Sequence, residues 1–321
     1  MKHFILKENM IANITTYFDK NYLSRFLNLK SSIEQFDINH KFYVLCLDDY
    51  VYKFLKEKNF SNIETILLSQ IEEKYEDLKN VKDKRETIEY YFTLSPYLPK
   101  YLYEEKKINH IIYVDTDYYF FNNPSEIIQS NYDSSIIMIR QHASLKYGQY
   151  NVGLLFFNFN FVETHEIVNK WSKQCLNECS DKVTSNSYAD QKYLDSWLSE
   201  LKHIRVYEPE YTSLAPWDKN IVIESNLKKM VAFHFHALKL NQNYFVTGFH
   251  NYNKKNSKLI LEKIYFPYIK NLRLIEKRYD LSSKSIRDNR KSILGKIIVF
   301  LRNIKSNLKK IFYSDKYNYP K

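Results

Sequence analysis

Strand-like and helix-like segments alternate through the first 120 residues, and this alternation constrains the fold more than any other feature of the chain. Four apolar segments are predicted as strands, at residues 10–18, 41–47, 63–68 and 110–114. Apolar residues at helical spacing occupy the stretches between them, at residues 22–36, 50–58 and 88–105. This order predicts an α/β fold with a mainly parallel sheet covered by helices on both faces. Ligands of such sheets bind beyond the carboxyl ends of the strands.

The pattern becomes mixed in the second half of the chain. Further strands are predicted at residues 134–140, 150–160 and 230–240, and further helices at 165–179 and 188–201. No internal repeat and no Gly/Ser-rich linker divides these segments. A chain of 321 residues with 44% hydrophobic residues can bury a substantial core. We therefore predict one domain over residues 1–283, followed by a separable tail over residues 284–321.

The tail carries most of the net charge of +11, because residues 284–321 hold eleven Lys or Arg against two Asp. Six apolar residues recur there every three or four positions, at Ile293, Ile297, Leu301, Ile304, Leu308 and Ile311. Five cations flank them, at Lys296, Arg302, Lys305, Lys309 and Lys310. This pattern predicts a C-terminal amphipathic helix that docks on an anionic membrane surface. The alternative is a helix that packs on the body.

Other features of the sequence indicate where in the cell the protein is located. No stretch has the pattern of a signal peptide, and no apolar run is long enough to span a membrane. The three cysteines, Cys46, Cys175 and Cys179, are too few for a disulfide framework. These features predict a cytoplasmic protein, held by its tail at the inner face of the cytoplasmic membrane.

Two carboxylates follow the strand at residues 110–114 in the sequence "HIIYVDTDYYFF". Unpaired charges at the end of a buried strand are costly unless a cation or water meets them. Asp115 and Asp117 therefore predict a site for Mg²⁺ or Mn²⁺. The alternative is that Asp115 ends a strand and Asp117 begins a turn. His234 and His236 are two apart in a predicted strand and so face the same way, which makes them candidate ligands.

Several segments in order resemble bacterial glycosyltransferases of the GT-A fold, in particular the family 8-like nucleotide-diphospho-sugar transferase group. They are "TTYFDKNYLSRFLNL", "RETIEYYFTLSPYLPKYLYE", "IIYVDTDYYFFNNPSEI", "YGQYNVGLLFFN", "YADQKYLDSW" and "AFHFHALK". The resemblance covers roughly residues 13–245. It implies a Rossmann-like GT-A domain and a metal-dependent transfer of a sugar from a nucleotide-diphosphate donor, a UDP-sugar above all.

The resemblance implies roles for the metal ligands. Asp115, Asp117 and His234 would hold Mn²⁺ (or Mg²⁺) against the donor diphosphate, with His236 as the alternative ligand. His234 matches the first histidine of the family pattern HFxGxxK, whose glycine is Ala237 here. Lys239 lies one residue before the lysine of that pattern and would meet the diphosphate. Its alternative role is that of a solvated lysine at a strand end.

Other positions are implied to contact the donor. Asn151 would lie near the transferred sugar, and Gly153 would let the backbone approach it. Asp190 would bind sugar hydroxyls, and Gln191 would lie beside the anomeric carbon; the alternative for this pair is helix capping. The remaining positions are assigned to the nucleotide: Arg85 to a phosphate, and Thr16, Tyr17 and Asp19 to the nucleoside.

The family also implies retention of the anomeric configuration and a glycan or lipid-linked acceptor of the bacterial surface, such as lipooligosaccharide or capsule. Two other classes of protein compete with this reading. A phosphatase of the haloacid dehalogenase class has the same carboxylate pair but continues with Thr or Val where this chain has Tyr119. A non-enzymatic membrane or nucleic-acid binder would explain the basic tail. The near-neutral body does not form a broad phosphate-binding surface, so we expect no nucleic-acid partner.

Overall fold

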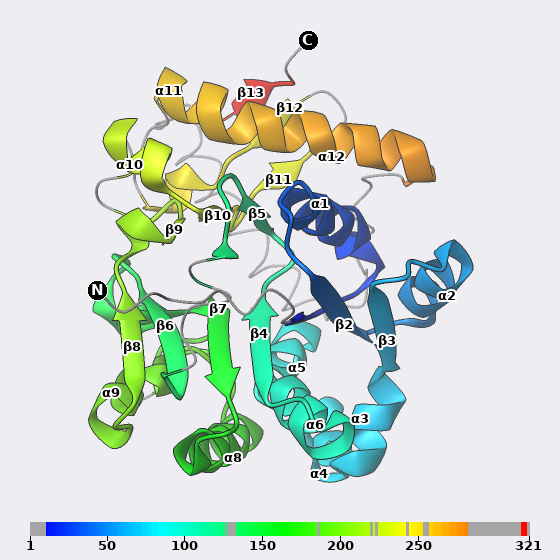
Figure 1. Cartoon of the computed structure of the whole chain (residues 1–321), viewed down its shortest axis with the longest axis vertical. Coiled ribbons are helices and arrows are strands. Elements are labelled where there is room, and N and C mark those ends of the chain that lie inside the picture. The colour runs from blue at the N-terminus through cyan, green and yellow to red at the C-terminus, as the bar shows by residue number, and fades with distance from the viewer. Residues whose placement is uncertain are drawn as a thin grey trace, which may run out of the picture.

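The computed structural model describes residues 11–125, 127, 133–184, 187–218, 221, 224–241, 244–252, 257–281 and 316–319. Its centre is a seven-stranded sheet with the order β3-β2-β1-β4-β7-β6-β8 (Figure 1). The strands are β1 (Ala12–Phe18), β2 (His40–Cys46), β3 (Ile63–Leu67), β4 (His110–Val114), β6 (Ile136–Arg140), β7 (Tyr150–Asn158) and β8 (Ile204–Tyr207).

Parallel pairing dominates this sheet. β1 pairs in parallel with β2 and β4, β2 with β3, and β6 with β8. β7 runs against both of its neighbours, β4 and β6. The parallel strands end at a common edge, where the chain leaves β1 and β4. The predicted mixed, mainly parallel α/β sheet is therefore confirmed.

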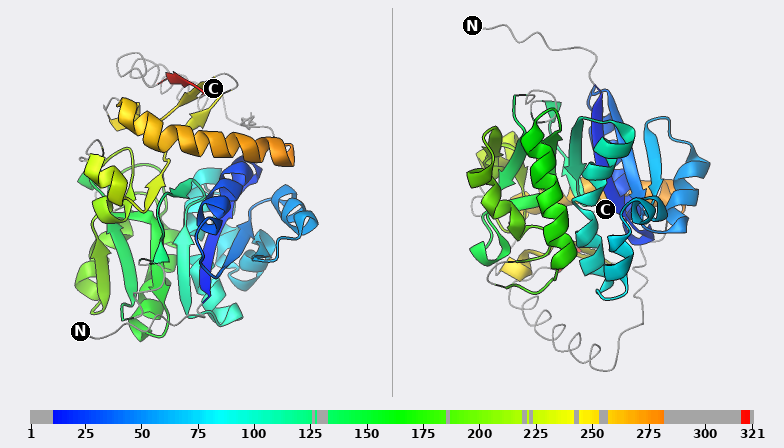
Figure 2. Two further views of the ribbon diagram at one scale, coloured as in Figure 1. Left: turned by 45° about the horizontal axis from the view of Figure 1, so that its top comes forward. Right: turned by 90° about the horizontal axis from the view of Figure 1, so that it is seen from below.

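Helices cover both faces because neighbouring residues of the inner strands are buried on opposite sides. On β4, Ile111 and Tyr113 pack with the helices of one face, and Ile112 and Val114 with those of the other. Figure 2 shows α6 and α8 side by side on the first face. That face carries α3 (Leu68–Lys74), α4 (Asp77–Lys82), α5 (Thr87–Leu94), α6 (Tyr97–Lys106), α8 (Val162–Asn177) and α9 (Trp197–Glu200). The second face carries α1 (Leu23–Glu34) and α2 (Asp49–Lys58).

Two small sheets extend the body beyond the edge where β4 ends (Figure 1). One has the order β5-β10-β9, and the other β11-β12-β13. Their strands are β5 (Tyr118–Phe120), β9 (Ser213–Leu214), β10 (Ala232–His234), β11 (Lys239–Leu240), β12 (Tyr244–Val246) and β13 (Lys316–Asn318). They share a third apolar cluster with α10 (Glu224–Lys229), α11 (Lys258–Ile260) and α12 (Phe266–Tyr279). α12 also packs on α1, where Asn271 donates to the side chain of Asn28 at 2.8 Å.

The end of the chain belongs to the body. β13 pairs antiparallel with β12, with Tyr317 opposite Phe245. The rings of Tyr317 and Tyr319 lie 5.8 Å from the Phe245 ring, and Arg273 lies over Tyr319 at 4.2 Å. A boundary at residue 284 therefore does not separate residues 316–319 from the domain. The amphipathic helix predicted at residues 292–312 lies outside the described residues.

Some element boundaries differ from those expected. The segment 188–201, expected as one helix, is a 3₁₀ helix, η3 (Lys192–Ser196), followed by the four residues of α9. The strand expected over residues 230–240 breaks after His234, because the chain turns at His236 and Ala237 before β11 begins. α3 and α4 were not expected at all. Within the part of the chain that the structure describes, no helix is long and apolar enough to cross a membrane.

Candidate metal centre and active-site pocket

A pocket of about 690 Å³ opens beyond the carboxyl ends of β1 and β4. Its wall includes Asp19 after β1, Asp115 and Asp117 after β4, and Asn151 at the start of β7. This is the edge at which open α/β sheets bind their ligands, and the volume is typical of small-molecule sites. The predicted crevice therefore exists, and the carboxylate pair faces into it.

Asp115, Asp117 and His234, which we call the pocket cluster, meet through strand pairing. Both carboxylates lie in the short link between β4 and β5, and β5 pairs antiparallel with β10, so that His234 stands opposite Tyr118. His234 Nε2 lies 3.1 Å from Asp117 Oδ1 and 3.9 Å from Asp115 Oδ2. One ligand atom from each residue fits within 4.8 Å of the others.

The three groups perturb one another strongly. Burial raises the pKa of Asp115 to about 6, and the nearby Asp117 charge adds to this rise. Burial opposes ionisation of Asp117 too, but His234 outweighs it and holds the pKa of Asp117 below its usual value. The carboxylates in turn raise the pKa of His234 against the effect of its own burial. Two anions that stabilise a cation between them are the expected surroundings of a metal ion.

The donor set fits a divalent ion that tolerates both oxygen and nitrogen. Two carboxylates suit Mg²⁺ and Mn²⁺, and the imidazole shifts the preference toward Mn²⁺. The side chain of Asp115 remains 30% exposed to the pocket, whereas that of His234 is 6% exposed. An ion held here would keep open positions on the pocket side for ligand oxygens. Asp115, Asp117 and His234 could therefore hold the ion that the sequence predicts.

Tyr118 supports the pocket cluster and was missed as a site residue in the sequence. Its ring is fully buried and stacks on the His234 ring with centroids 4.5 Å apart. Asn151 donates through Nδ2 to the Tyr118 hydroxyl at 2.8 Å, and the same atom lies 3.3 Å from His234 Nδ1. Outer groups of this kind orient metal ligands. Its position in the sequence, directly after Asp117, could have identified Tyr118 as a site residue.

Gly153 leaves room for this arrangement. A Cβ atom at this position would lie 2.7 Å from Asp115 Oδ2 and 2.9 Å from the Tyr118 ring, closer than atoms can pack. The Gly153 carbonyl accepts the Asp115 amide at 2.9 Å. Gly153 therefore backs the metal centre, and its backbone lies against Asp115 at the pocket wall.

Asp190 lies on the pocket wall with 2% of its surface exposed. Burial raises its pKa to about 7, opposed by a hydrogen bond from Ser95 and supported by the charge of Asp115. Its carbonyl accepts the Trp171 indole N–H at 2.8 Å. A buried carboxyl group with a raised pKa that faces a pocket is typical of a functional site. It does not cap η3, whose first residue follows Gln191.

Gln191 joins two segments of the wall. Its Nε2 donates to the Tyr147 carbonyl at 2.8 Å, and its Oε1 accepts the Val152 amide at 3.2 Å. The side chain makes no capping bond to η3. Both polar atoms are therefore engaged by the protein, and the side chain lies at a fixed place in the pocket lining.

The residues predicted near the nucleoside divide into two groups. Tyr17 and Asp19 line the pocket, and the Tyr17 hydroxyl lies 2.9 Å from Ser95 Oγ. Asp19 accepts the Asn21 amide at 2.9 Å and caps a 3₁₀ turn. Thr16, on β1, is fully buried and lies outside the pocket lining.

Arg85 and Lys239 also lie outside the pocket lining. The Arg85 guanidinium donates to the Cys175 carbonyl at 2.8 Å and to the Leu176 carbonyl at 2.5 Å. It thereby satisfies the C-terminal end of α8, a favourable place for a cation. Lys239 is exposed on β11, opposite Val246. These placements do not support the phosphate contacts that we expected from the two residues.

His236 lines the pocket but does not share a strand face with His234. β10 ends at His234, and Ala237 takes a left-handed backbone conformation with φ +59°. This conformation favours glycine, the residue of the family pattern at that position. The two histidine rings stand 5.6 Å apart and nearly perpendicular. His234 alone of the two belongs to the pocket cluster.

Aromatic residues form another part of the wall, and the sequence did not single them out. Trp217 packs edge-on against His234 and His236, with ring centroids 5.3 Å away in each case. Tyr147 and Tyr188 pack against each other at 4.9 Å, and Tyr252 lies 5.7 Å from Trp217. Such surfaces suit the apolar faces of sugar rings. The residues come from separate loops, so no local pattern marks them.

Comparisons with known proteins give relatives without an assigned activity. No protein-family model matches the sequence. Two proteins of Bacillus subtilis (strain 168), both described as uncharacterized, are similar to it. YfnF is 26% identical over 206 residues, which cover 60% of this chain and 67% of YfnF. YfnD is 23% identical over 281 residues, which cover 81% of this chain and 88% of YfnD.

The solved structures that resemble the chain include glycosyltransferases, with TM-scores below 0.5. Mouse xyloside xylosyltransferase 1 in its apo form has a TM-score of 0.49 and 14% identity, over 71% of this chain and 98% of that chain. The galactosyltransferase LgtC with donor and acceptor sugar analogues has a TM-score of 0.47 and 16% identity, over 70% and 87%. GlyE of Streptococcus pneumoniae TIGR4 has a TM-score of 0.47 and 14% identity, over 86% and 66%.

Proposed function

We propose that this protein is a metal-dependent glycosyltransferase that moves a sugar from a nucleotide-diphosphate donor, a UDP-sugar, to a glycan or lipid-linked acceptor of the bacterial surface. The pocket cluster carries the proposal. Asp115, Asp117 and His234 converge at the wall of a pocket of about 690 Å³, beyond the carboxyl ends of the strands. Two anions and an imidazole at this place suit a cation that also binds a diphosphate.

The residues of the chain divide the work of the reaction. Asp115, Asp117 and His234 hold Mn²⁺ or Mg²⁺, which when bound stabilises the negative charge on the departing nucleoside diphosphate. Tyr118 and Asn151 fix the His234 ring through the contacts described above. Asp190 and Gln191 lie on the same pocket wall, where Asp190 orients the transferred sugar by hydrogen bonds to its hydroxyls and Gln191 lies beside the anomeric carbon. Positioning of this kind lowers the barrier by holding the reacting groups together.

The pocket also has places for the rest of the donor and for the acceptor. Tyr17 near the end of β1 and Asp19 just after it contact the nucleoside, and the wall formed by Trp217 and Tyr252 faces the acceptor sugar. The resemblance to family 8-like enzymes supports retention of the anomeric configuration. The buried Asp190 carboxyl group lies where it can hydrogen-bond a sugar hydroxyl in either protonation state.

A donor screen tests the proposal. The full chain is mixed with UDP-, GDP- and CMP-sugars, with and without Mn²⁺, and the thermal midpoint is measured. We expect one nucleotide class to raise the midpoint only when Mn²⁺ is present, because a ligand that binds the folded state alone stabilises it. Release of the nucleoside diphosphate in the presence of acceptor extracts then measures turnover. Release of phosphate from phosphomonoesters, without stabilisation by any sugar nucleotide, would contradict the proposal.

The proposed location is the inner face of the cytoplasmic membrane, reached through the basic segment before β13. Five cations there, each contributing on the order of 1 kcal/mol near an anionic surface, favour reversible docking. Replacing Lys296, Arg302, Lys305, Lys309 and Lys310 with Gln should abolish co-sedimentation with anionic vesicles while the thermal midpoint stays unchanged. Equal sedimentation of the two proteins would contradict the docking role.

A further inference from the structure

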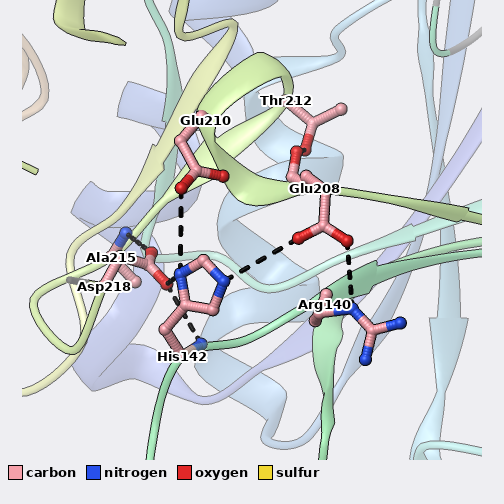
Figure 3. Close-up of polar contacts among 7 residues, drawn as sticks. All are labelled: Arg140, His142, Glu208, Glu210, Thr212, Ala215 and Asp218. Atoms are coloured by element: carbon pink, nitrogen blue, oxygen red, sulfur yellow. Dashed lines mark hydrogen bonds and ion pairs between the residues drawn. The ribbon is translucent and has the colours of Figure 1, made fainter. Parts of the chain in front are cut away.

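A second group of potential metal ligands lies behind the pocket wall, and we call it the outer cluster. It comprises His142, Glu208 and Glu210 (Figure 3). His142 follows β6, and its sequence neighbours Gln141 and Ala143 line the pocket. The two glutamates flank the start of a short 3₁₀ turn after β8. The proposed glycosyl transfer uses none of these three side chains.

The distances in the outer cluster are longer than hydrogen bonds. His142 Nε2 lies 3.8 Å from Glu208 Oε2, and His142 Nδ1 lies 4.0 Å from Glu210 Oε1. A direct hydrogen bond would bring these atoms to about 3 Å. Two ligands of one ion, each about 2.1 Å from it, lie roughly 3 to 4 Å apart. One atom from each of the three side chains fits within 4.8 Å of the others. Glu208 and Glu210 approach different nitrogens of the ring, and one ion can bind only one of these, so a shared ion would lie beside Nε2 and Glu208 with Glu210 within reach.

The His142 ring is placed as metal-bound imidazoles are. Its Nδ1 is shielded from solvent and makes no hydrogen bond with any described residue. This atom faces Asp218 Oδ1 at 3.7 Å, and Asp218 is 1% exposed. With the ion at Nε2, beside Glu208, the other ring nitrogen lies 3.7 Å from the Asp218 carboxylate. A carboxylate on the second nitrogen is the usual orienting partner of a histidine ligand.

Contacts that do not involve the His142 ring hold the carboxylates of Glu208 and Asp218 in place (Figure 3), and for Asp218 they include the backbone amide of His142 at 3.3 Å. Arg140 donates to Glu208 Oε1 at 3.0 Å, which leaves Oε2 directed toward the histidine. The Thr212 hydroxyl donates to the Glu208 carbonyl at 3.0 Å. The Ala215 amide donates to Asp218 Oδ2 at 2.7 Å. These contacts come from two separate segments, so the cluster is a preformed junction between β6 and the loop after β8.

We propose that His142, Glu208 and Glu210 bind a second divalent transition-metal ion, with Asp218 orienting the histidine. The imidazole favours Mn²⁺ or Zn²⁺ over Mg²⁺ and Ca²⁺. The ion ties the end of β6 to the loop that carries Trp217, whose ring packs on His234 and His236. The site is thus a structural clamp for the pocket wall. It is separate from the proposed transfer of a sugar and does not depend on it.

Counting bound ions tests the site without any measurement of activity. The full chain is stripped with a chelator and titrated with Mn²⁺, and free Mn²⁺ is followed by its paramagnetic resonance signal; Zn²⁺ and Mg²⁺ are then added as competitors. The wild type should bind two Mn²⁺ ions. Glu210→Gln should lose one of them and Asp117→Asn the other, and the double variant should bind none. Zn²⁺ should displace the ion of the outer cluster, and Mg²⁺ should not.

Controls separate loss of a ligand from loss of structure. Glu200→Gln removes a glutamate that pairs with Lys170 elsewhere on the surface, and it should keep both ions. Glu208→Gln should behave like Glu210→Gln, and all variants should unfold cooperatively in the presence of chelator. A wild type that binds a single ion, lost in Asp117→Asn, would overturn the second site. A wild type with a single ion that is lost in Glu210→Gln instead would support the second site and count against the proposed function.

Discussion

The pocket cluster and the outer cluster use the same kinds of side chain in different ways. Trp217 and Asp218 are consecutive residues that connect them: the Trp217 ring packs on His234, and the Asp218 carboxylate faces His142. In the pocket cluster, His234 lies 3.1 Å from Asp117, within hydrogen-bonding distance. In the outer cluster every contact of the His142 ring is 3.7 Å or longer.

The two clusters differ in the contacts that hold their side chains in place. The pocket cluster is held by contacts among its own members and by Tyr118 and Asn151. The outer cluster is held by contacts from outside: Arg140 binds Glu208, and the Ala215 amide fixes Asp218, which faces His142. We therefore expect the pocket cluster to govern the reaction and the outer cluster to govern the shape of the wall.

The largest expected effect is that of Asp117→Asn. The change keeps the shape of the side chain and removes one anion from the cation site. Turnover should fall on the order of 10³-fold, because the charge on the leaving group loses its stabilisation. Mn²⁺-dependent donor binding, measured by calorimetry, should disappear as well.

The matched control for this variant is Asp133→Asn, which removes an exposed carboxylate that pairs with Arg205. Its turnover and donor binding should equal those of the wild type. If a variant of Glu208 slowed turnover as much as Asp117→Asn, the two clusters would not have the separate roles that we expect. Such a result would place the outer cluster in the reaction itself.

Asp190→Ala should slow transfer about 10²-fold and leave nucleotide affinity nearly unchanged. Its carboxyl group would contact the sugar and not the diphosphate, so its loss misplaces the reacting centre without weakening the metal contacts. Turnover number and affinity for the nucleoside diphosphate are measured separately. Loss of nucleotide binding as large as that in Asp117→Asn would move Asp190 into the metal centre.

Burial of Asp190 should also be visible in the pH dependence of stability. Its folded pKa of about 7 exceeds the unfolded value of about 4, so the folded state binds the proton more tightly. The stability that this group contributes is therefore present at about pH 4 and is lost as the pH rises toward 7. Asp190→Asn should raise the unfolding free energy of the metal-free protein at pH 8 by about 4 kcal/mol and change it little at pH 4. Equal curves from denaturant unfolding would contradict this.

Gln191→Ala should have the smallest effect, about a tenfold loss of turnover. Its amide joins the Tyr147 carbonyl to the Val152 amide, so the wall around the sugar loosens when it is removed. Gln191→Glu is the sharper variant, because it keeps the size but removes the donor to Tyr147. Unchanged rates in both variants would remove Gln191 from the site.

The carboxylates of the pocket cluster could be predicted because they occur in a recognisable local sequence pattern. Asp115 and Asp117 stand directly after an apolar strand, and the order of strands placed that end at the binding edge. His236 was placed wrongly because the alternation of residues 230–240 continues past the true end of the strand. The turn is set by contacts from elsewhere: the Arg25 guanidinium donates to the Leu238 carbonyl at 2.7 Å, and Gly248 packs against Ala237.

Other parts of the site have no local signature. The outer cluster joins His142 to Glu208 and Glu210, which lie more than sixty positions later in the chain. The parallel pairing of β6 with β8 brings the two segments together. Arg85 was assigned to a phosphate because it precedes an aromatic helix in the sequence. The fold places it instead at the end of α8, where the free carbonyls attract it.

The pairing of β13 with β12 gives the chain two points of attachment around residues 282–315. The described chain runs to residue 281, just after α12, and is again part of the body from Lys316, so residues 282–315 are joined to the body at both ends. A body held by one flexible tether can rotate over a surface, whereas two anchors restrict its orientation. β12 leads within a few residues to Asn251 and Tyr252 in the pocket wall. A surface that binds residues 282–315 would therefore act on β12, the strand that leads to the Tyr252 side of the pocket.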